Sequence, residues 1–218
     1  MDLKEAMLKR HTVRKYTKKE ISEDLVKKLE QRIDKKNTEF DLGIKLVIND
    51  DSVINKFIKL IVAKNVKNYI IMAGKDDKNL QEKIGYVGAD LMLYAQTLGL
   101  NTWWIGGTFN KNISKNVEGN KVVSVIVIGY GITEGRQHKS KTMEEVSTYE
   151  GDIPDWFKEG VKAALLAPTA LNKQDFNIEF KDSKVKIECN RSSFSEVNLG
   201  IIKYYFELGA GKDNFEWI

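Results

Sequence analysis

Residues 88–99 read GADLMLYAQTLG, and residues 198–209 read NLGIIKYYFELG. Both stretches carry apolar side chains on most faces at helical spacing, and both end in glycine, a common stop signal for helices. A helix that is apolar on nearly all sides is covered by the rest of its protein. We therefore predict two central helices, Gly85–Leu98 and Ser195–Leu208, in the core of the fold.

Periodic stretches on either side of the first apolar helix predict a mixed unit of helices and strands. Apolar residues recur at helical spacing in Leu3–Arg10 and again after Ser22, a suitable N-cap residue. Runs rich in branched residues predict three strands, at Gly43–Ile48, Lys67–Ala73 and Val122–Gly129.

The second part of the chain repeats this order of elements. Pro154 precedes a predicted helix, Asp155–Leu166, and the runs Phe176–Phe180 and Val185–Cys189 predict a hairpin before the second apolar helix. Because helix, strand and apolar helix recur in the same order, we interpret the chain as a diverged internal duplication. No linker rich in proline, glycine or serine divides it, which favours one α+β domain.

The predicted domain spans residues 1–218, with pseudo-repeat halves of approximately residues 1–150 and 151–218. Its composition is that of a globular protein, with 42% hydrophobic and 30% charged residues, and excludes disorder. The 35 basic and 31 acidic residues leave a net charge of +4, too mild for a dedicated nucleic-acid or membrane-surface protein. Between Glu20 and Glu39 the lysines alternate with acidic residues, as on a solvated helix face.

Residue types exclude several further classes. The single cysteine, Cys189, excludes an intrachain disulfide and a cysteine-rich zinc site. The longest apolar run, Val122–Tyr130, is far shorter than the roughly 20 residues that span a bilayer, and the first residues are charged where a signal peptide is apolar. We therefore expect a cytoplasmic protein.

The sequence holds no motif of metal, nucleotide-loop or hydrolytic chemistry. The two histidines, His11 and His138, are far apart and lack a metal-ligand spacing. No P-loop or GxGxxG pattern occurs, and no nucleophile elbow supports a Ser/His/Asp triad. We expect no metal and no catalytic side chain.

Three other stretches can bind a ligand. Arg10, His11, Thr12 and Arg14 combine guanidinium, imidazole and hydroxyl groups that suit a phosphate or carboxylate, although a solvated basic helix end would have the same pattern. Pro168–Gln174 is either an ordinary turn or a polar contact with a ligand. In Trp103–Gly107, paired glycines either expose backbone N–H groups to a planar ligand or form a flexible turn beside an aromatic patch.

Taken together, the motifs resemble those of the FMN-dependent nitroreductase family. The resemblance is narrower to members in which the two halves of one chain mimic the usual dimer. It implies a nitroreductase-like α+β fold of two intertwined, pseudo-symmetric halves, with central apolar helices and antiparallel sheets. The matching motifs are RHTVRKY at 10–16, GADLMLYAQTLGLNTWWIGG at 88–107, VIVIGYG at 125–131, HKSKTMEEV at 138–146 and APTALNKQDF at 167–176.

The resemblance also implies a role for each matching residue. Arg10, His11, Thr12 and Arg14 match positions that hold the ribityl phosphate and ring edge of non-covalent FMN. Lys139 and Lys141 match a basic pair that closes the phosphate site. The turn that reaches the flavin from the second subunit corresponds to Pro168, Thr169, Ala170 and Asn172. The segment beside the reactive edge of the ring corresponds to Ile105, Gly106 and Gly107.

The activity that the resemblance implies is reduction of an electron-poor nitro or quinone acceptor through the flavin, with NAD(P)H as the electron donor. The cofactor performs this chemistry, and the protein supplies position and electrostatics. Gly106 stands where the family commonly has a glutamate, so the acceptor preference stays open. An FMN-binding protein without rapid turnover, serving storage, sensing or special flavin chemistry, is the alternative. We expect one chain to form a complete site as a monomer that mimics a dimer.

Overall fold

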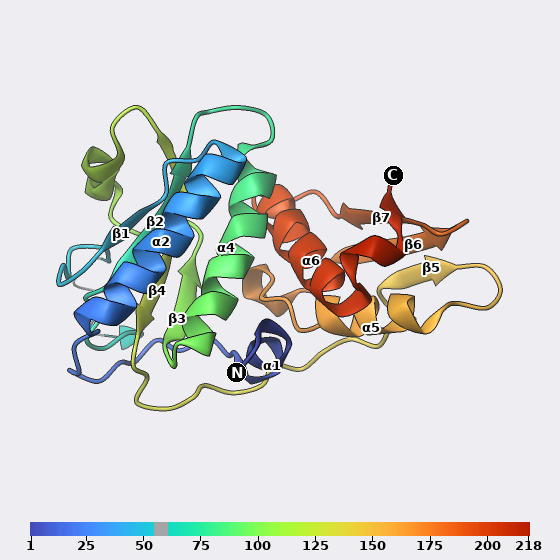
Figure 1. Cartoon of the computed structure of the whole chain (residues 1–218), viewed down its shortest axis with the longest axis horizontal. Coiled ribbons are helices and arrows are strands. Elements are labelled where there is room, and N and C mark those ends of the chain that lie inside the picture. The colour runs from blue at the N-terminus through green and yellow to red at the C-terminus, as the bar shows by residue number, and fades with distance from the viewer. Residues whose placement is uncertain (55–60) are drawn as a thin grey trace.

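The first part of the chain forms a four-stranded sheet. The computed structural model describes residues 1–54 and 61–218. The sheet has the order β1-β2-β4-β3, and every neighbouring pair is antiparallel (Figure 1). Its strands are β1 (Lys45–Val47), β2 (Tyr69–Gly74), β3 (Asn101–Ile105) and β4 (Lys121–Gly129).

Both faces of this sheet are covered, because successive side chains of a strand point to opposite faces. On one face, Ile70 and Met72 of β2 pack against α2 (Glu23–Phe40) and α4 (Leu80–Thr97). On the other face, Tyr69 packs beneath the chain segment around Val13 and the 3-10 helix η1 (Lys111–Val117). Double coverage explains why β2 is apolar without alternation.

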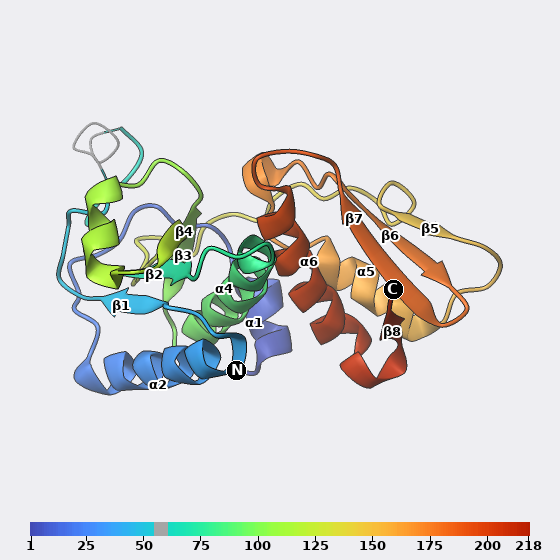
Figure 2. The ribbon, with the colours of Figure 1, turned by 90° about the horizontal axis from the view of Figure 1, so that it is seen from above.

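The second sheet has the order β5-β6-β7-β8 (Figure 2). The central pair, β6 and β7, is an antiparallel hairpin as predicted, but β5 is parallel to β6 and β8 is parallel to β7. The sheet is therefore mixed rather than antiparallel. Each outer strand is joined to its neighbour through a helix, and such a crossover returns the chain in the same direction. These elements are β5 (Ser147–Tyr149), α5 (Asp155–Ala164), β6 (Phe176–Lys181), β7 (Lys184–Cys189), α6 (Ser195–Ala210) and β8 (Glu216–Trp217).

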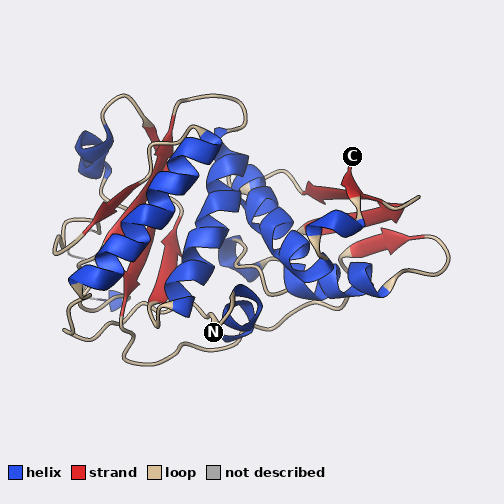
Figure 3. Cartoon of the chain, in the orientation of Figure 1, coloured by secondary structure: helices blue, strands red, loops and turns tan. Residues whose placement is uncertain are grey.

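Helices α4 and α6 pack against each other at the centre of the molecule, as predicted for the two apolar helices (Figures 1 and 3). A Cβ atom on Gly85 would lie 2.1 Å from the carbonyl oxygen of Val197, and one on Gly200 would lie 2.0 Å from that of Glu82. Each glycine thus meets the residue three positions before the other glycine, so the contact between the two helices is reciprocal. The contact makes Gly85 equivalent to Gly200. The sequence comparison of residues 88–99 with 198–209 instead aligns Gly200 with Asp90.

The N-terminal helix α1 (Leu3–Lys9) begins with a capping box between Asp2 and Glu5 and contacts both central helices. It carries Ala6 and Met7 into the hydrophobic cluster of the second half. The first residues of the chain therefore lie against the other half, which is the intertwining that the fold class implies.

The end of α6 and the strand β3 differ from the prediction. Helix α6 continues through Gly209 and ends at Gly211, whose φ of 80° suits glycine. Gly209 instead allows close packing on α5, because a Cβ there would lie 2.5 Å from the carbonyl oxygen of Glu159. Trp103 and Trp104, predicted to lie in an aromatic patch or turn, belong to strand β3 because their backbones pair with β4.

Two short 3-10 helices complete the described elements, η2 (Ala170–Asn172) and η3 (Lys212–Asn214). Among the helices of residues 1–54 and 61–218, none combines the length and the apolar character needed to cross a membrane.

Candidate functional site

A cavity of about 570 Å³ lies between the two halves. One wall consists of the segment 10–14 and the end of β3 with the residues that follow it. The opposite wall consists of the turn 168–172 and the first turns of α6. The volume falls within the range of about 300–1,000 Å³ that is usual for small-molecule sites.

The structure brings three of the four groups of residues with a predicted role in flavin binding to this cavity. These residues line it: Arg10, His11, Thr12, Arg14, Ile105, Gly106, Gly107, Pro168, Thr169, Ala170 and Asn172. They come from both halves of the chain, so their proximity depends on the packing of α4 against α6.

Strand β3 positions the segment 10–14 along the first wall. The backbone N–H of Val13 donates to the carbonyl of Thr102 at 3.0 Å, which places the segment beside β3. Arg10 is 4% exposed, and its Nε donates to the hydroxyl of Tyr205 on α6 at 3.1 Å. Arg14 is exposed and its guanidinium lies 5.6 Å from the centre of the Trp103 ring, a cation–π contact.

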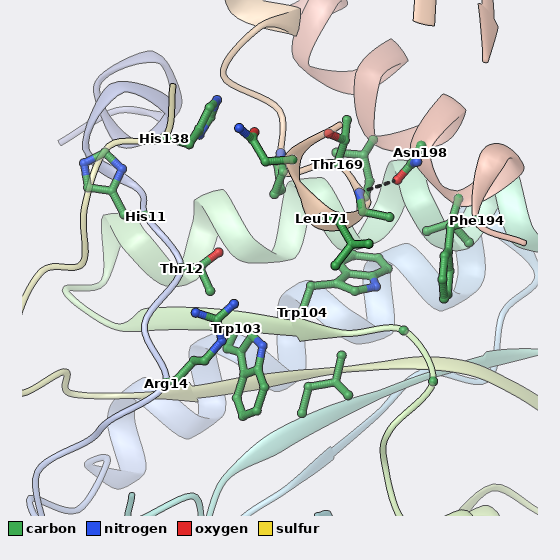
Figure 4. Close-up of a pocket in the computed structure, with 18 of the residues that line it drawn as sticks. His11, Thr12, Arg14, Trp103, Trp104, His138, Thr169, Leu171, Phe194 and Asn198 are labelled. Atoms are coloured by element: carbon green, nitrogen blue, oxygen red, sulfur yellow. Dashed lines mark hydrogen bonds between the residues drawn. The ribbon is translucent and has the colours of Figure 1, made fainter. Parts of the chain in front are cut away.

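The two histidines of the chain meet at the same end of the cavity (Figure 4). Nε2 of His138 lies 2.9 Å from the carbonyl oxygen of Leu165. Because a carbonyl can only accept, this nitrogen carries the proton, and Nδ1 is left for another partner. Burial, followed by the charges of Arg10 and His138, lowers the pKa of His11, while Glu134 acts in the opposite direction.

Lys139 and Lys141 do not line the cavity. The carbonyl of Lys139 accepts from Nδ2 of Asn172 at 2.9 Å and from Nε2 of Gln174 at 3.2 Å. Lys141 donates its backbone N–H to Oε1 of Gln174 at 2.8 Å and its Nζ to the carbonyl of Gln174 at 2.9 Å. These lysines hold the turn, while Arg136, just before them, lines the cavity.

Side-chain amides fix the turn 168–172 of the second wall. The backbone N–H of Ala170 donates to Oδ1 of Asn198 on α6 at 3.1 Å. Gln174 is 1% exposed, and its backbone N–H donates to Oγ1 of Thr169 at 3.1 Å. The turn was among the predicted ligand-binding stretches, but Asn198 was not, because a single asparagine in a helix that also carries Glu196, Lys203 and Glu207 forms no motif.

The other end of the cavity is apolar. Trp104, Leu171 and Phe194 line it together with residues of α6. The ring of Phe194 lies against Gly106, where a Cβ atom would be 2.6 Å from Cε1 of that ring. Glycine is therefore the residue that leaves room for Phe194 in this wall.

The arrangement agrees with a comparison of the chain with protein families. The family model "Putative TM nitroreductase" matches residues 2–210. The chain belongs to this nitroreductase family. No curated protein sequence matches this nitroreductase chain.

Solved structures share the fold of this nitroreductase. A "putative nitroreductase" from Thermotoga maritima is 21% identical, with a TM-score of 0.72 over 98% of this chain and 85% of its own. A "putative nitroreductase" from Exiguobacterium sibiricum, solved in complex with FMN, is 15% identical, with a TM-score of 0.52 over 66% of this chain and 95% of its own. A nitroreductase family protein from Streptococcus pneumoniae is 15% identical, with a TM-score of 0.51 over 66% of this chain and 98% of its own.

The cavity of this nitroreductase suits an elongated ligand with an anionic group at one end and a planar apolar group at the other. Arg10 and Arg136 flank the pair His11 and His138 at one end, since Arg10 precedes His11 and Gly135, next to Arg136, packs on His11. Arg14 lies farther along the wall, beside Trp103, and the described lining residues include no acidic side chain. Across the part of the chain that the structure describes, no group of histidine, cysteine and acidic residues could hold a metal ion.

Proposed function

We propose that this chain is an FMN-dependent oxidoreductase that takes electrons from NAD(P)H and reduces an electron-poor acceptor of the nitro or quinone type. The observation that carries the proposal is the cavity itself, which has His11 and His138 at one end, Trp104, Leu171 and Phe194 at the other (Figure 4), and three arginines among its lining residues. Membership of the nitroreductase family supports an oxidoreductase. The Exiguobacterium relative, which shares the fold, was solved with FMN bound.

The residues present fit the phosphate of FMN. Guanidinium groups bind phosphate oxygens in a bidentate manner, and Arg10 is already fixed by Tyr205 before any ligand binds. Arg14 and the hydroxyl of Thr12 line the same wall. We assign these groups to the phosphate and the adjoining ring edge. The assignment of Lys139 and Lys141 to phosphate binding remains a prediction, since the hydrogen bonds of both residues described above go to the turn.

The residues at the other end fit a planar ring. Trp104 and Phe194 offer apolar surface, and the backbone N–H groups of Gly106 and Gly107 lie at the end of β3. Backbone donors aimed at an atom that gains negative charge stabilise the reduced form. FMN, when bound, supplies the acceptance and release of hydride. The chain binds and orients the two reactants and excludes water from the apolar end.

We also propose that one chain holds one FMN without a second copy of itself. Both walls of the cavity come from the same chain, and α4 and α6 bury their apolar faces on each other. Mixing an Arg10→Ala/Arg14→Ala chain with an Asn172→Ala chain, each poor in flavin alone, tests this proposal. An intrachain site predicts that the mixture stays flavin-poor, whereas restored binding would show that two chains share the site.

The central experiment measures flavin binding and reduction. Purified protein should be yellow, absorb at about 450 nm and release about one FMN per chain on heating. Arg14→Ala should weaken FMN binding by about 1.5–3 kcal/mol, the loss of a charge-assisted hydrogen bond. Lys15→Ala is the matched control, because Lys15 is also exposed but does not line the cavity.

If the protein is yellow, reduction by NADH or NADPH distinguishes an oxidoreductase from an FMN-binding protein without rapid turnover. The proposed enzyme bleaches its flavin when either nucleotide is added and regains its colour when a quinone or nitroaromatic acceptor follows. Flavin that stays oxidised would make this an FMN-binding protein without rapid turnover. A colourless protein with no affinity for FMN would contradict both.

A further inference from the structure

Leu171 has an unfavourable backbone conformation. It lies in η2 with φ 54° and ψ 19°, in the left-handed region. Asn172 and Gln174 share positive φ values, but asparagine tolerates this region because its short polar side chain bonds locally. A leucine there is uncommon, since its Cβ crowds the following carbonyl.

The side chain of Leu171 is also unusually exposed. It is 90% accessible, although leucine is among the residues most often buried. It lines the cavity, and Figure 4 shows it pointing toward Trp104 on the opposite wall. Strain and exposure therefore coincide at one residue, at the apolar end of the site.

The surrounding structure maintains this conformation. Asn198 holds the backbone of Ala170, and the backbone N–H of Asn172 donates to the carbonyl of Thr169 at 2.9 Å. On the other side of Leu171, the side chain of Asn172 is bonded to the carbonyl of Lys139. Strained residues persist only where neighbours over-determine them, and they concentrate at ligand sites.

We propose that Leu171 is a preformed clamp that packs on the planar ring of bound FMN, so that ligand binding covers its exposed side chain. The inference rests on the proposed function, which supplies the ligand. His11 and His138 lie at the end of the cavity away from Leu171 and Phe194 (Figure 4), and Arg10 and Arg136 are their neighbours in the chain. A ligand whose phosphate is held at that end places its ring toward Leu171. A turn whose backbone is fixed before binding loses little conformational entropy on binding, which raises affinity.

Two substitutions separate the side chain from the strain. Leu171→Ala removes the apolar contact and keeps a Cβ in the left-handed region. Leu171→Gly removes both the contact and the strain. The matched control is Ser183→Gly in the β6–β7 turn, where φ is 62° and the residue does not line the cavity. The measurements are the thermal unfolding of ligand-free protein and the dissociation constants of FMN and of riboflavin, which lacks the phosphate.

Both Leu171 variants should weaken FMN and riboflavin by the same factor, about tenfold, because the two ligands share the ring. Leu171→Gly should unfold at the same temperature as the wild type or a higher one. Ser183→Gly should do likewise without any change in flavin affinity.

Three results would overturn the inference. Unchanged affinity for both flavins in the two variants would show that Leu171 does not contact the ring. A changed KM for the acceptor with unchanged flavin affinity would assign Leu171 to the acceptor instead. A wild-type protein that binds neither flavin would overturn both the proposed function and this inference. That failure is distinguishable from the other two, because it is seen without any Leu171 variant.

Discussion

The two walls of the cavity are stabilised in different ways. The first wall rests on β3, which pairs with β4 along its whole length, and segment 10–14 is hydrogen bonded beside it. The second wall is the turn 168–172, a 3-10 turn held by the side chains of Asn198, Gln174 and Asn172. One wall thus relies on a backbone ladder, and the other on a small number of polar side chains.

This difference predicts how each wall responds to substitution. On the first wall, a side chain such as Arg14 projects from a backbone that the sheet fixes, so its removal should affect ligand contacts alone. On the second wall, loss of one buried amide leaves backbone groups unpaired and frees the turn. Substitutions on the first wall should therefore weaken ligand binding without destabilising the fold. Substitutions of the amides on the second wall should weaken binding and stability together.

The largest effect is expected where the two walls are joined. Gly200→Ala would place a Cβ 2.0 Å from the carbonyl oxygen of Glu82, so α4 and α6 would have to separate. Overpacking of this kind should lower the free energy of unfolding by about 3 kcal/mol or more, measured by urea denaturation. Gly107→Ala is the control, since a Cβ there meets nothing within 4 Å. Equal stability of the two variants would mean that the helices adjust freely.

Gln174→Leu tests the second wall. The change removes acceptor and donor groups for Lys141 N–H, for the carbonyl of Lys139 and for Asn172. We expect a loss of about 2–4 kcal/mol in the free energy of unfolding together with weaker FMN binding.

The control for Gln174 is Asn37→Leu, far from the cavity. Asn37 bonds both the N–H and the carbonyl of Ile44 at 2.9 Å. Its loss should destabilise the protein by about 1–3 kcal/mol and leave FMN affinity unchanged. If Gln174→Leu lowers stability and keeps full affinity, the two walls do not differ as proposed.

Arg136→Ala sharpens the assignment of the anionic end. Arg136 lines the cavity, whereas Lys139 is exposed and outside it. The affinity for FMN should fall about tenfold in Arg136→Ala, and the affinity for riboflavin should stay unchanged. Lys139→Ala provides the comparison, and its affinity for FMN should change little. If Lys139→Ala loses FMN affinity and Arg136→Ala does not, the result would favour the assignment of Lys139 and Lys141 to phosphate binding.

The smallest expected effect is a pH dependence of FMN binding. The pKa of His11 is lowered by burial and by Arg10 and His138, against Glu134, so the imidazole is neutral at pH 8 in the free protein. A nearby phosphate dianion would raise this pKa, and binding would then take up a proton. FMN affinity should therefore rise from about pH 8 to about pH 7, a range above the second pKa of the phosphate at about 6, with riboflavin affinity flat. His11→Gln should abolish the slope.

Much of the fold was predictable because burial leaves a local pattern. The apolar helices α4 and α6, the strand β4 and the β6–β7 hairpin were all confirmed. Strand β3 was missed because a five-residue run followed by glycines resembles a turn, and only pairing with β4 makes it a strand. The parallel strands β5 and β8 are shorter still, and neither has a local signal.

The chain by itself determined which chemical groups could hold a ligand, because the motifs at 10–14, 105–107 and 168–172 are local in sequence and line one cavity. Tertiary structure alone decided that His11 and His138 share one end of it. It also decided that Arg136 rather than Lys139 lines the cavity, and that Asn198 of a buried helix holds the turn. The physical reason is that composition and spacing specify which groups are present. Which of these groups face the cavity depends on the packing of α4 on α6 and on hydrogen bonds between residues far apart in the sequence.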